Sequence, residues 1–181
     1  HGPFGEDGQI QKILKKNNIK FTHSGLSASK ICFNKLKSKK VIEQNKILTP
    51  KYIYLKTKNL DENKIVNIKK VFSKFIIKPI KSGSSFGIKI IRNNKDFKLL
   101  IRNIKNFKRE LKNHQEILIE EFISGRELTV STLKFNRKIE ALAVTEIKTK
   151  NIFFDYKAKY SKGYAKHILP ARLGKKEYNQ C

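Results

Sequence analysis

A loop rich in glycine and serine is the first segment of this sequence whose residue types could carry chemistry. Residues 81–87, Lys-Ser-Gly-Ser-Ser-Phe-Gly, lie between two short apolar runs. Glycines let a backbone turn its N–H groups toward an anion and serine hydroxyls add donors, so the loop could wrap a phosphate. Lys78 precedes the loop in an apolar segment, where a phosphate would satisfy its charge. The alternative is an ordinary turn, with a lysine that reaches solvent from an edge strand.

A pair of glutamates frames the second candidate segment, 120–127, which reads Glu-Glu-Phe-Ile-Ser-Gly-Arg-Glu. Glu120 and Glu127 lie at opposite ends of an expected turn, so their carboxylates could face one site. Backbone groups of 121–123 could bind the edge of an adenine while a carboxylate binds ribose hydroxyls. Spacing alone favours a simpler alternative, a hairpin that carries solvated charges.

Aromatic residues and lysines alternate in a third segment, 153–160, which reads Phe-Phe-Asp-Tyr-Lys-Ala-Lys-Tyr. It lies within a polar stretch, 148–164, that we expect to be mostly irregular. Loops that close over a substrate often have this composition. The alternative is an ordinary surface loop.

The composition is that of a chain able to build a core. Of its 181 residues, 39% are hydrophobic, and it contains no apolar run of about 18 residues. No charged-then-apolar leader opens the sequence, and Cys32 and Cys181 are too few for a disulfide framework. We therefore expect a cytoplasmic protein with free thiols and no membrane segment.

The formal charge of +26 arises from 41 Lys and Arg against 15 Asp and Glu. Such an excess is typical of nucleic-acid binders. Only six of these residues are arginines, and the 35 lysines are scattered without an arginine-rich block or an aromatic platform. Because Lys, Asn and Ile share AT-rich codons, genome composition accounts for the excess. We expect no nucleic-acid partner, and a basic nucleic-acid-binding module stays as the non-enzyme alternative.

Apolar periodicity predicts an antiparallel-rich α+β chain that positions these segments at strand ends. A short helix should follow Gly8, and a second, 27–45, should break near Asn34. Segments 117–123 and 127–135 are expected to pair as a hairpin around Gly125. Further helices are expected at 61–72, around 97–107 and from 175, and extended segments at 19–22, 49–55, 75–80, 88–91 and 139–147.

The order of these features resembles the ATP-grasp ligases. A strand lysine, a Gly/Ser loop, a hairpin with paired glutamates and an aromatic–lysine loop follow one another. The opening segment 1–11, His-Gly-Pro-Phe-Gly-Glu-Asp-Gly-Gln-Ile-Gln, closely resembles a pattern of D-alanine–D-alanine ligases, and 154–160 is similar to their mobile loop. The resemblance spans essentially the whole chain. It departs at Lys12, where that family usually has a small residue, and at Lys157, where an acidic residue is common.

The resemblance implies an ATP-grasp fold and a ligase that uses ATP and Mg²⁺ to join two D-alanines, through an acylphosphate, for peptidoglycan synthesis. It implies that the phosphates are bound by Lys35, Lys78 and Ser85, adenine by Glu120 and the backbone of Glu121 to Ile123, and ribose by Glu127. It implies a catalytic set of Ser84, Lys159 and Tyr160, in which Ser84 and Tyr160 link to Glu127 on loop closure and Lys159 reaches the transferred phosphate. His1 and Glu6 would lie on the substrate side.

The same resemblance divides the chain into 1–34, the end of an α/β substrate-side domain, and 35–181, an incomplete ATP-grasp domain. We expect an internal part of a longer protein, inactive by itself, with the magnesium ligands beyond Cys181. The alternatives within ligases are a D-alanine–D-lactate enzyme or another ATP-grasp carboxylate–amine ligase, and Tyr160 favours the dipeptide former. A homodimer is left open.

Overall fold

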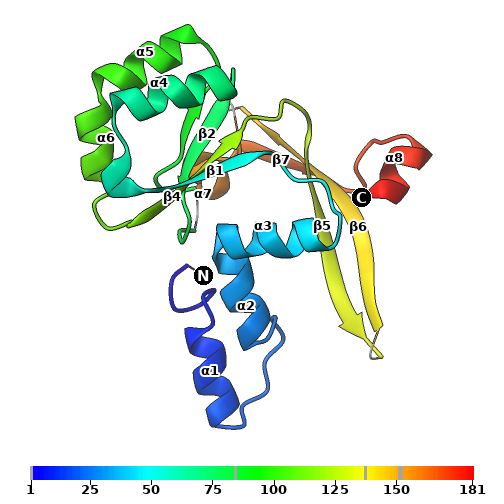
Figure 1. The fold of residues 1–181 in the computed structure, drawn as a ribbon. Helices are drawn as coiled ribbons and strands as arrows, with labels where there is room; N and C mark the ends of the chain where they lie inside the picture. Colours follow the sequence, from blue (N-terminus) through cyan, green and yellow to red (C-terminus); the bar gives the residue numbers. More distant parts are fainter. Residues whose placement is uncertain (1, 84, 137, 151–152) are drawn as a thin grey trace. The chain divides into compact units, whose positions relative to one another are not determined.

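The computed structural model describes the chain except for residues 1, 84, 137 and 151–152. The described residues form two compact units, 1–123 and 124–181. Each unit has its own antiparallel sheet, with four strands in the first unit and three in the second (Figure 1).

Three helices open the first unit: α1 (Gln9–Lys16), α2 (Leu26–Phe33) and α3 (Lys35–Gln44). The predicted break is confirmed at Asn34, whose ψ of 101° lies outside the helical region. The Asn34 side chain then caps α3, because its Oδ1 accepts a hydrogen bond from the N–H of Lys37 at 3.0 Å. Residues 19–22, which we expected to be extended, belong to no strand.

The sheet of the first unit has the order β1-β4-β2-β3, and every neighbouring pair is antiparallel. Side chains alternate between its two faces, so Ile117 and Ile119 point to one side of β4 while Leu118 and Glu120 point to the other. The strands are β1 (Tyr52–Lys56), β2 (Phe75–Pro79), β3 (Lys89–Ile91) and β4 (Glu116–Glu121), and the short 3₁₀ helix η1 (Thr57–Asn59) follows β1.

Helices α4 (Glu62–Val71), α5 (Asn94–Arg102) and α6 (Ile104–Glu110) cover one face of this sheet (Figure 1). Asp61 and Asn93 cap α4 and α5 by accepting hydrogen bonds from backbone N–H groups three residues later. The core between helices and sheet consists of apolar side chains that are almost wholly removed from solvent: Leu55, Ile65, Ile68, Phe75, Ile77, Ile91, Leu100, Ile104, Phe107, Ile117 and Ile119. The opposite face of the sheet carries the buried Leu118 together with the polar residues Lys78 and Glu120.

The second unit is built on β5 (Glu127–Phe135), β6 (Lys138–Thr149) and β7 (Ala165–Ile168), in that order across the sheet. Two short helices, α7 (Tyr156–Tyr160) and α8 (Lys175–Gln180), complete it. The expectation that 148–164 is mostly irregular is therefore wrong for α7. Asp155 begins that helix, because its Oδ1 accepts a hydrogen bond from the N–H of Ala158 at 2.8 Å.

The predicted hairpin between 117–123 and 127–135 is also wrong. Strand β4 lies in the sheet of the first unit between β1 and β2, whereas β5 pairs with β6 in the second. Beyond the paired registers, the N–H of Glu121 donates to Lys51 O at 2.9 Å and that of Phe122 to Lys74 O at 3.0 Å. Both edges of β4 are thus occupied, and no edge remains on which a return strand could pair.

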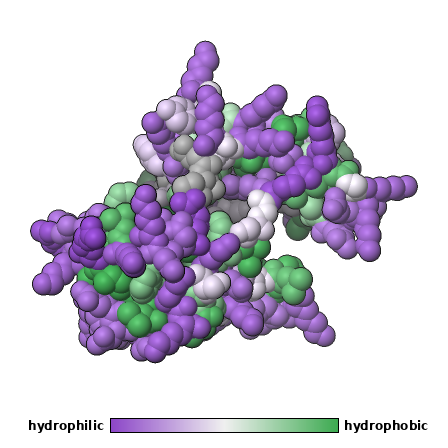
Figure 2. Space-filling model, turned by 90° about the horizontal axis from the view of Figure 1, so that it is seen from above, coloured by the Kyte–Doolittle hydropathy of each residue, from purple (hydrophilic) through white to green (hydrophobic). Residues whose placement is uncertain are grey.

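The two units differ in how much apolar surface they bury. In the second unit only Val144, Ala158 and Ala171 are buried apolar residues among those described, whereas the β5–β6 strands expose Leu133, Phe135, Ile139 and Leu142. Hydrophilic side chains spread over the visible face in Figure 2 instead of gathering in one band. No helix within the described ranges is long and apolar enough to cross a membrane.

Candidate nucleotide-binding site

Lys78 and Glu120 meet on the sheet face opposite α4, α5 and α6. They come from neighbouring strands, β2 and β4, and the Lys78 ammonium forms an ion pair with Glu120 Oε2. Glu120 is only 5% exposed although it carries a charge. A buried carboxylate requires partners, since desolvation without them is strongly unfavourable. The strand lysine and the first glutamate of the sequence motif are therefore brought together, as expected of two residues assigned to one nucleotide.

A second lysine, Lys39, which is buried, completes this cluster, and sequence reasoning missed it. Lys39 belongs to α3, and its Nζ lies 3.0 Å from Glu120 Oε1. The same Nζ donates to Thr49 Oγ1 at 2.6 Å and to Pro50 O at 2.7 Å, and it lies 4.8 Å from the centre of the Tyr52 ring. One signal was present in the sequence. Lys35 and Lys39 are four residues apart in a predicted helix, so both point to one side of it.

Lys35 is held against the Gly/Ser loop by its backbone and its side chain. Asn34 and Lys81 form an isolated antiparallel bridge, and the N–H of Lys35 donates to Ile80 O at 3.1 Å. The Lys35 ammonium donates to Ser82 O at 2.7 Å. Phosphate binding was predicted separately for Lys35 and for the loop. The structure places these two elements in direct contact within the first unit.

The loop itself has a backbone that few residues could adopt. Ser85 has a φ of 61° and Gly87 a φ of 69°, both in the left-handed region. A Cβ on Gly87 would lie 2.9 Å from Pro79 Cγ, so a side chain at this position would clash with Pro79. Phe86, between them, donates its N–H to Gly83 O at 3.1 Å, so the loop closes as a tight turn. Glycine-rich turns of this kind can present N–H groups to an anion. Ser84 lies outside the described residues.

Glu6, expected on the substrate side, lies next to the same loop. Its Oε2 is 3.4 Å from the position that a Cβ on Gly83 would occupy, and Gly2 Cα is 3.7 Å from that position. These are van der Waals distances, so the opening acidic motif and the Gly/Ser loop are neighbours. His1, the other substrate-side expectation, is outside the described residues.

The segment expected to bind adenine follows directly on β4. Because Glu121 and Phe122 already use their N–H groups within the sheet, the free donor of this segment is at Ile123. Within the described part of the chain, the Ile123 N–H has no backbone acceptor, and the residue is 61% exposed. The N–H of this exposed residue, three positions after Glu120 and just beyond a buried strand, suits the edge of a planar base.

The remaining predicted residues lie in the second unit. Glu127 is exposed at the start of β5, and Lys159 and Tyr160 form the last turn of α7. Lys159 Nζ lies 5.4 Å from the centre of the Phe154 ring, and the rings of Tyr156 and Tyr160 are 4.7 Å apart. The roles assigned to these residues by family resemblance stay predictions.

An ion pair that the sequence did not suggest joins Arg126, just before β5, to Glu146 on β6. Arg126 donates from Nε to Glu146 Oε1 at 2.9 Å and from a terminal nitrogen to Oε2 at 2.8 Å, and it also bonds Arg172 O at 2.7 Å. This two-point contact holds the pKa of the Glu146 carboxyl below its ordinary value and raises the pKa of Arg126. The two residues are 20 positions apart, so no local spacing revealed the pair.

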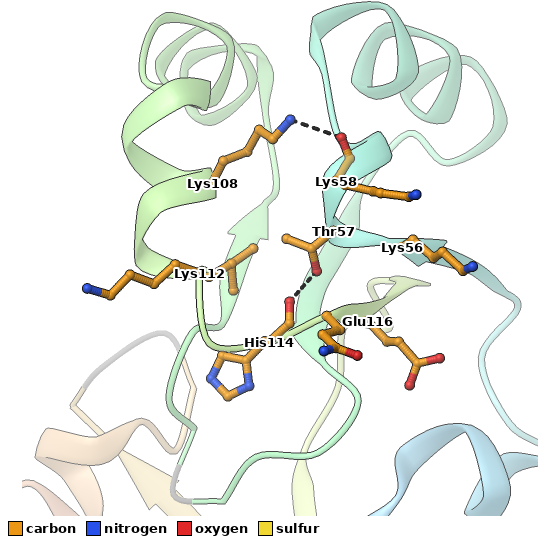
Figure 3. A pocket seen from close by; sticks show the side chains of 9 residues that line it. Lys56, Thr57, Lys58, Lys108, Lys112, His114 and Glu116 are labelled. Atoms are coloured by element: carbon orange, nitrogen blue, oxygen red, sulfur yellow. Dashed lines mark hydrogen bonds between the residues drawn. The ribbon is translucent and has the colours of Figure 1, made fainter.

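A pocket of about 660 Å³ lies at the other end of β4, around Thr57 and His114 (Figure 3). Four lysines line it, but their side chains diverge: Lys108 donates to Lys58 O at 3.1 Å, Lys112 points to one side, and Lys56 and Lys58 point to the other. Burial, with a smaller effect of the Lys35 charge, lowers the pKa of His114. Ammonium groups that diverge do not build one anion site, and none of the predicted site residues lines this pocket.

The family model described as "D-ala D-ala ligase C-terminus" matches residues 41–181. The chain belongs to this family. It is 44% identical, over 97% of its length, to the D-alanine–D-alanine ligase of Pelagibacter ubique, and it covers 54% of that protein. The chain thus spans about half the length of the curated relatives that it matches. The resemblance that the sequence motifs indicated is confirmed.

Solved structures agree on the fold. D-alanyl-alanine synthetase A of Vibrio cholerae matches with a TM-score of 0.79 at 25% identity, over 99% of this chain and 53% of that one. A D-alanine–D-alanine ligase of Bacillus anthracis, complexed with ATP, matches with a TM-score of 0.67 at 27% identity, over 96% of this chain and 52% of that one. The predicted α+β fold of the ATP-grasp type is confirmed. The proposed boundary between residues 34 and 35 stays a prediction.

Proposed function

We propose that the protein containing this chain is an ATP-dependent ligase that joins two D-alanines for peptidoglycan synthesis in the cytoplasm. The observation that carries the proposal is the joint placement of Lys78 and Glu120 on one sheet face, with Lys35 tied to the Gly/Ser loop, in a chain of this family. Cationic groups and loop N–H groups suit phosphates, and a buried acceptor beside an exposed N–H suits a base. The residues present therefore fit ATP.

In this proposal the residues of the first unit bind and orient the nucleotide. Lys35 and Lys78 neutralise phosphate charge, and the loop 81–87 supplies N–H donors, which is the main requirement of phosphoryl transfer. Glu120 and the backbone of 121–123 bind adenine. When bound, ATP supplies the phosphoryl group that activates the first D-alanine carboxylate, and the amine of the second D-alanine then displaces phosphate.

The residues of the second unit are assigned by family resemblance. Glu127 binds ribose, Lys159 stabilises the transferred phosphate, and Tyr160 stabilises a closed state that excludes water from the acylphosphate. Mg²⁺ belongs to the proposal as the counter-ion of the phosphates. Among the described residues no group of three or more His, Cys, Asp or Glu side chains is gathered, so no magnesium ligand is assigned here.

Phosphate release tests the proposal. The full-length protein should release phosphate from ATP only when D-alanine is present, and D-alanyl-D-alanine should accumulate in step. Residues 1–181 alone should release none. Comparable turnover with L-alanine would contradict the proposal, and a product formed with D-lactate at neutral pH would favour the D-alanine–D-lactate alternative.

A further inference from the structure

Lys39 is the most completely satisfied charged side chain in the first unit. It is 4% exposed, and its ammonium group meets Thr49 Oγ1, Pro50 O and Glu120 Oε1 within 3.0 Å. A lysine ammonium has three N–H donors and no acceptor. All three donors are therefore used inside the protein, and none is left for a ligand. Any effect of Lys39 on a bound nucleotide must act through one of its partners.

The partner that can transmit such an effect is Glu120. Its two oxygens are held by different lysines, Oε1 by Lys39 from α3 and Oε2 by Lys78 from β2. A carboxylate offers about four lone-pair positions, so two lysines leave acceptor capacity over. Held from both sides, the carboxylate cannot rotate toward Lys78 alone. Without Lys39, Glu120 would be free to turn and pair fully with Lys78.

A fixed carboxylate discriminates between purines by hydrogen-bond polarity. An ionised carboxylate only accepts, so it attracts the 6-amino group of adenine and repels the 6-oxo group of hypoxanthine or guanine. A site built around a hydrogen-bonding group rejects the analogue that cannot pair with it, because the buried group is then left unsatisfied. The discrimination between 6-amino and 6-oxo purines depends on how firmly the Glu120 carboxylate is held in one orientation.

We propose that Lys39 is a positioning residue that holds Glu120 in place and thereby sets a preference for 6-amino over 6-oxo purine nucleotides. This inference rests on the proposed ATP binding. A purely structural Lys39 would change the affinity for all nucleotides together. A positioning Lys39 changes the ratio between ATP and inosine triphosphate, which differ at the exocyclic group and the adjoining ring nitrogen.

The test compares dissociation constants of ATP and inosine triphosphate, each with Mg²⁺ and without D-alanine, by calorimetry on the full-length protein. The parent should prefer ATP by about 10- to 100-fold, the range of a hydrogen bond to a charged group. Lys39→Met should reduce that preference to less than about 3-fold, while Lys40→Met, at an exposed position on the same helix, should retain it. Lys39→Arg keeps the charge and should restore part of the preference.

A second variant keeps the inference testable if Lys39→Met does not fold. Thr49→Val removes one anchor of the Lys39 ammonium without changing any charge, and it should lower the preference by about 2- to 5-fold. An unchanged ratio in both variants would overturn the inference, as would equal losses for both nucleotides. A parent protein that binds neither nucleotide would instead overturn the proposed function. A parent that binds both equally would overturn the inference alone.

Discussion

The two sheets of this chain are both antiparallel, yet only the first is buried in the manner of a domain core. Phe75, Ile77, Ile117 and Ile119 are fully buried under three helices, whereas Val144 is the one buried apolar residue in the described strands of the second sheet. Strands with little burial open more easily than strands in a packed core. We therefore expect the first sheet to open less easily than the second.

The candidate site residues follow this division. Lys78 and Glu120 project from the packed sheet, where their positions are fixed by neighbouring strands and by Lys39. Lys159 and Tyr160 lie on α7, a helix of five residues in the unit with little burial. The proposed binding groups thus lie on the packed sheet and the proposed closing groups on a less buried element, as the proposed function requires of an enzyme that opens to admit substrate.

The largest effect should come from removing a core side chain in the first sheet. Phe75→Ala should destabilise residues 1–181 by about 3–5 kcal/mol, because it leaves a cavity between β2 and the helices. Leu142→Ala, at an exposed position of β6, should change stability by less than about 0.5 kcal/mol. Urea unfolding measures both. Similar losses of stability for the two substitutions would contradict the difference in burial between the two sheets.

The next effect concerns the charge that the packed sheet presents. Lys78→Ala in the full-length protein should weaken ATP binding by about 10- to 100-fold, equivalent to roughly 1.5–3 kcal/mol, because one charged contact to phosphate is lost. Lys74→Ala, at an exposed position just before β2, is the matched control and should leave the affinity unchanged. If Lys78→Ala retains the ATP affinity, the Lys78–Glu120 pair is structural only.

A smaller effect should appear when the proposed closing element is changed. Tyr160→Phe in the full-length protein should lower turnover at a cost of roughly 1–3 kcal/mol and increase unproductive ATP hydrolysis, while initial ATP binding changes little. The reason is the proposed role of that hydroxyl in stabilising the closed state. Tyr156→Phe, one turn earlier on α7, serves as the control. Parallel losses in ATP affinity and turnover for Tyr160→Phe would argue against a latch.

The smallest effect is a dependence on acid that belongs to the second unit. Because Arg126 lowers the pKa of Glu146, the pair contributes stability above the unfolded pKa of glutamate, about 4.3, and that contribution is lost as the pH falls through the lower folded pKa. Glu146→Gln should therefore flatten the pH dependence of unfolding of this unit as the pH falls below about 4.3.

The exposed Glu140, on the same strand, provides the comparison for that experiment. Glu140→Gln should leave the acid profile of the second unit unchanged. A profile that is equally steep with and without Glu146 would show that the ion pair with Arg126 does not contribute.

Local signals in the sequence predicted much of the first unit. The apolar run around Lys78, the glycines of the loop and the break at Asn34 each depend on a few adjacent residues, and each is found in the structure. The short α7 was also signalled locally, by Asp155 in front of Tyr156, but the polar composition of 148–164 hid it. Element type is a local property, and local reasoning recovers it when the signal is considered.

Pairings between distant residues could not be predicted in the same way. Strand β4 finds its neighbours in β1 and β2, both far earlier in the chain, so the adjacent β5 was the wrong partner. Lys39 and Glu120 are equally remote from one another, and Arg126 reaches Glu146 only because β5 and β6 are paired. The order of the strands in the sheets decides which charged residues become neighbours. That order cannot be read from any short stretch of sequence.

The contact between Lys35 and the Gly/Ser loop has a consequence for how the protein is made. The Lys35 ammonium and Ser82 O are 47 positions apart, so the loop acquires its shape only after a long stretch of chain has closed on itself. At a synthesis rate of about 5–20 residues per second, several seconds separate the appearance of these two residues. The proposed nucleotide site can thus be completed only some seconds after the residues of α2 and α3 have been synthesised.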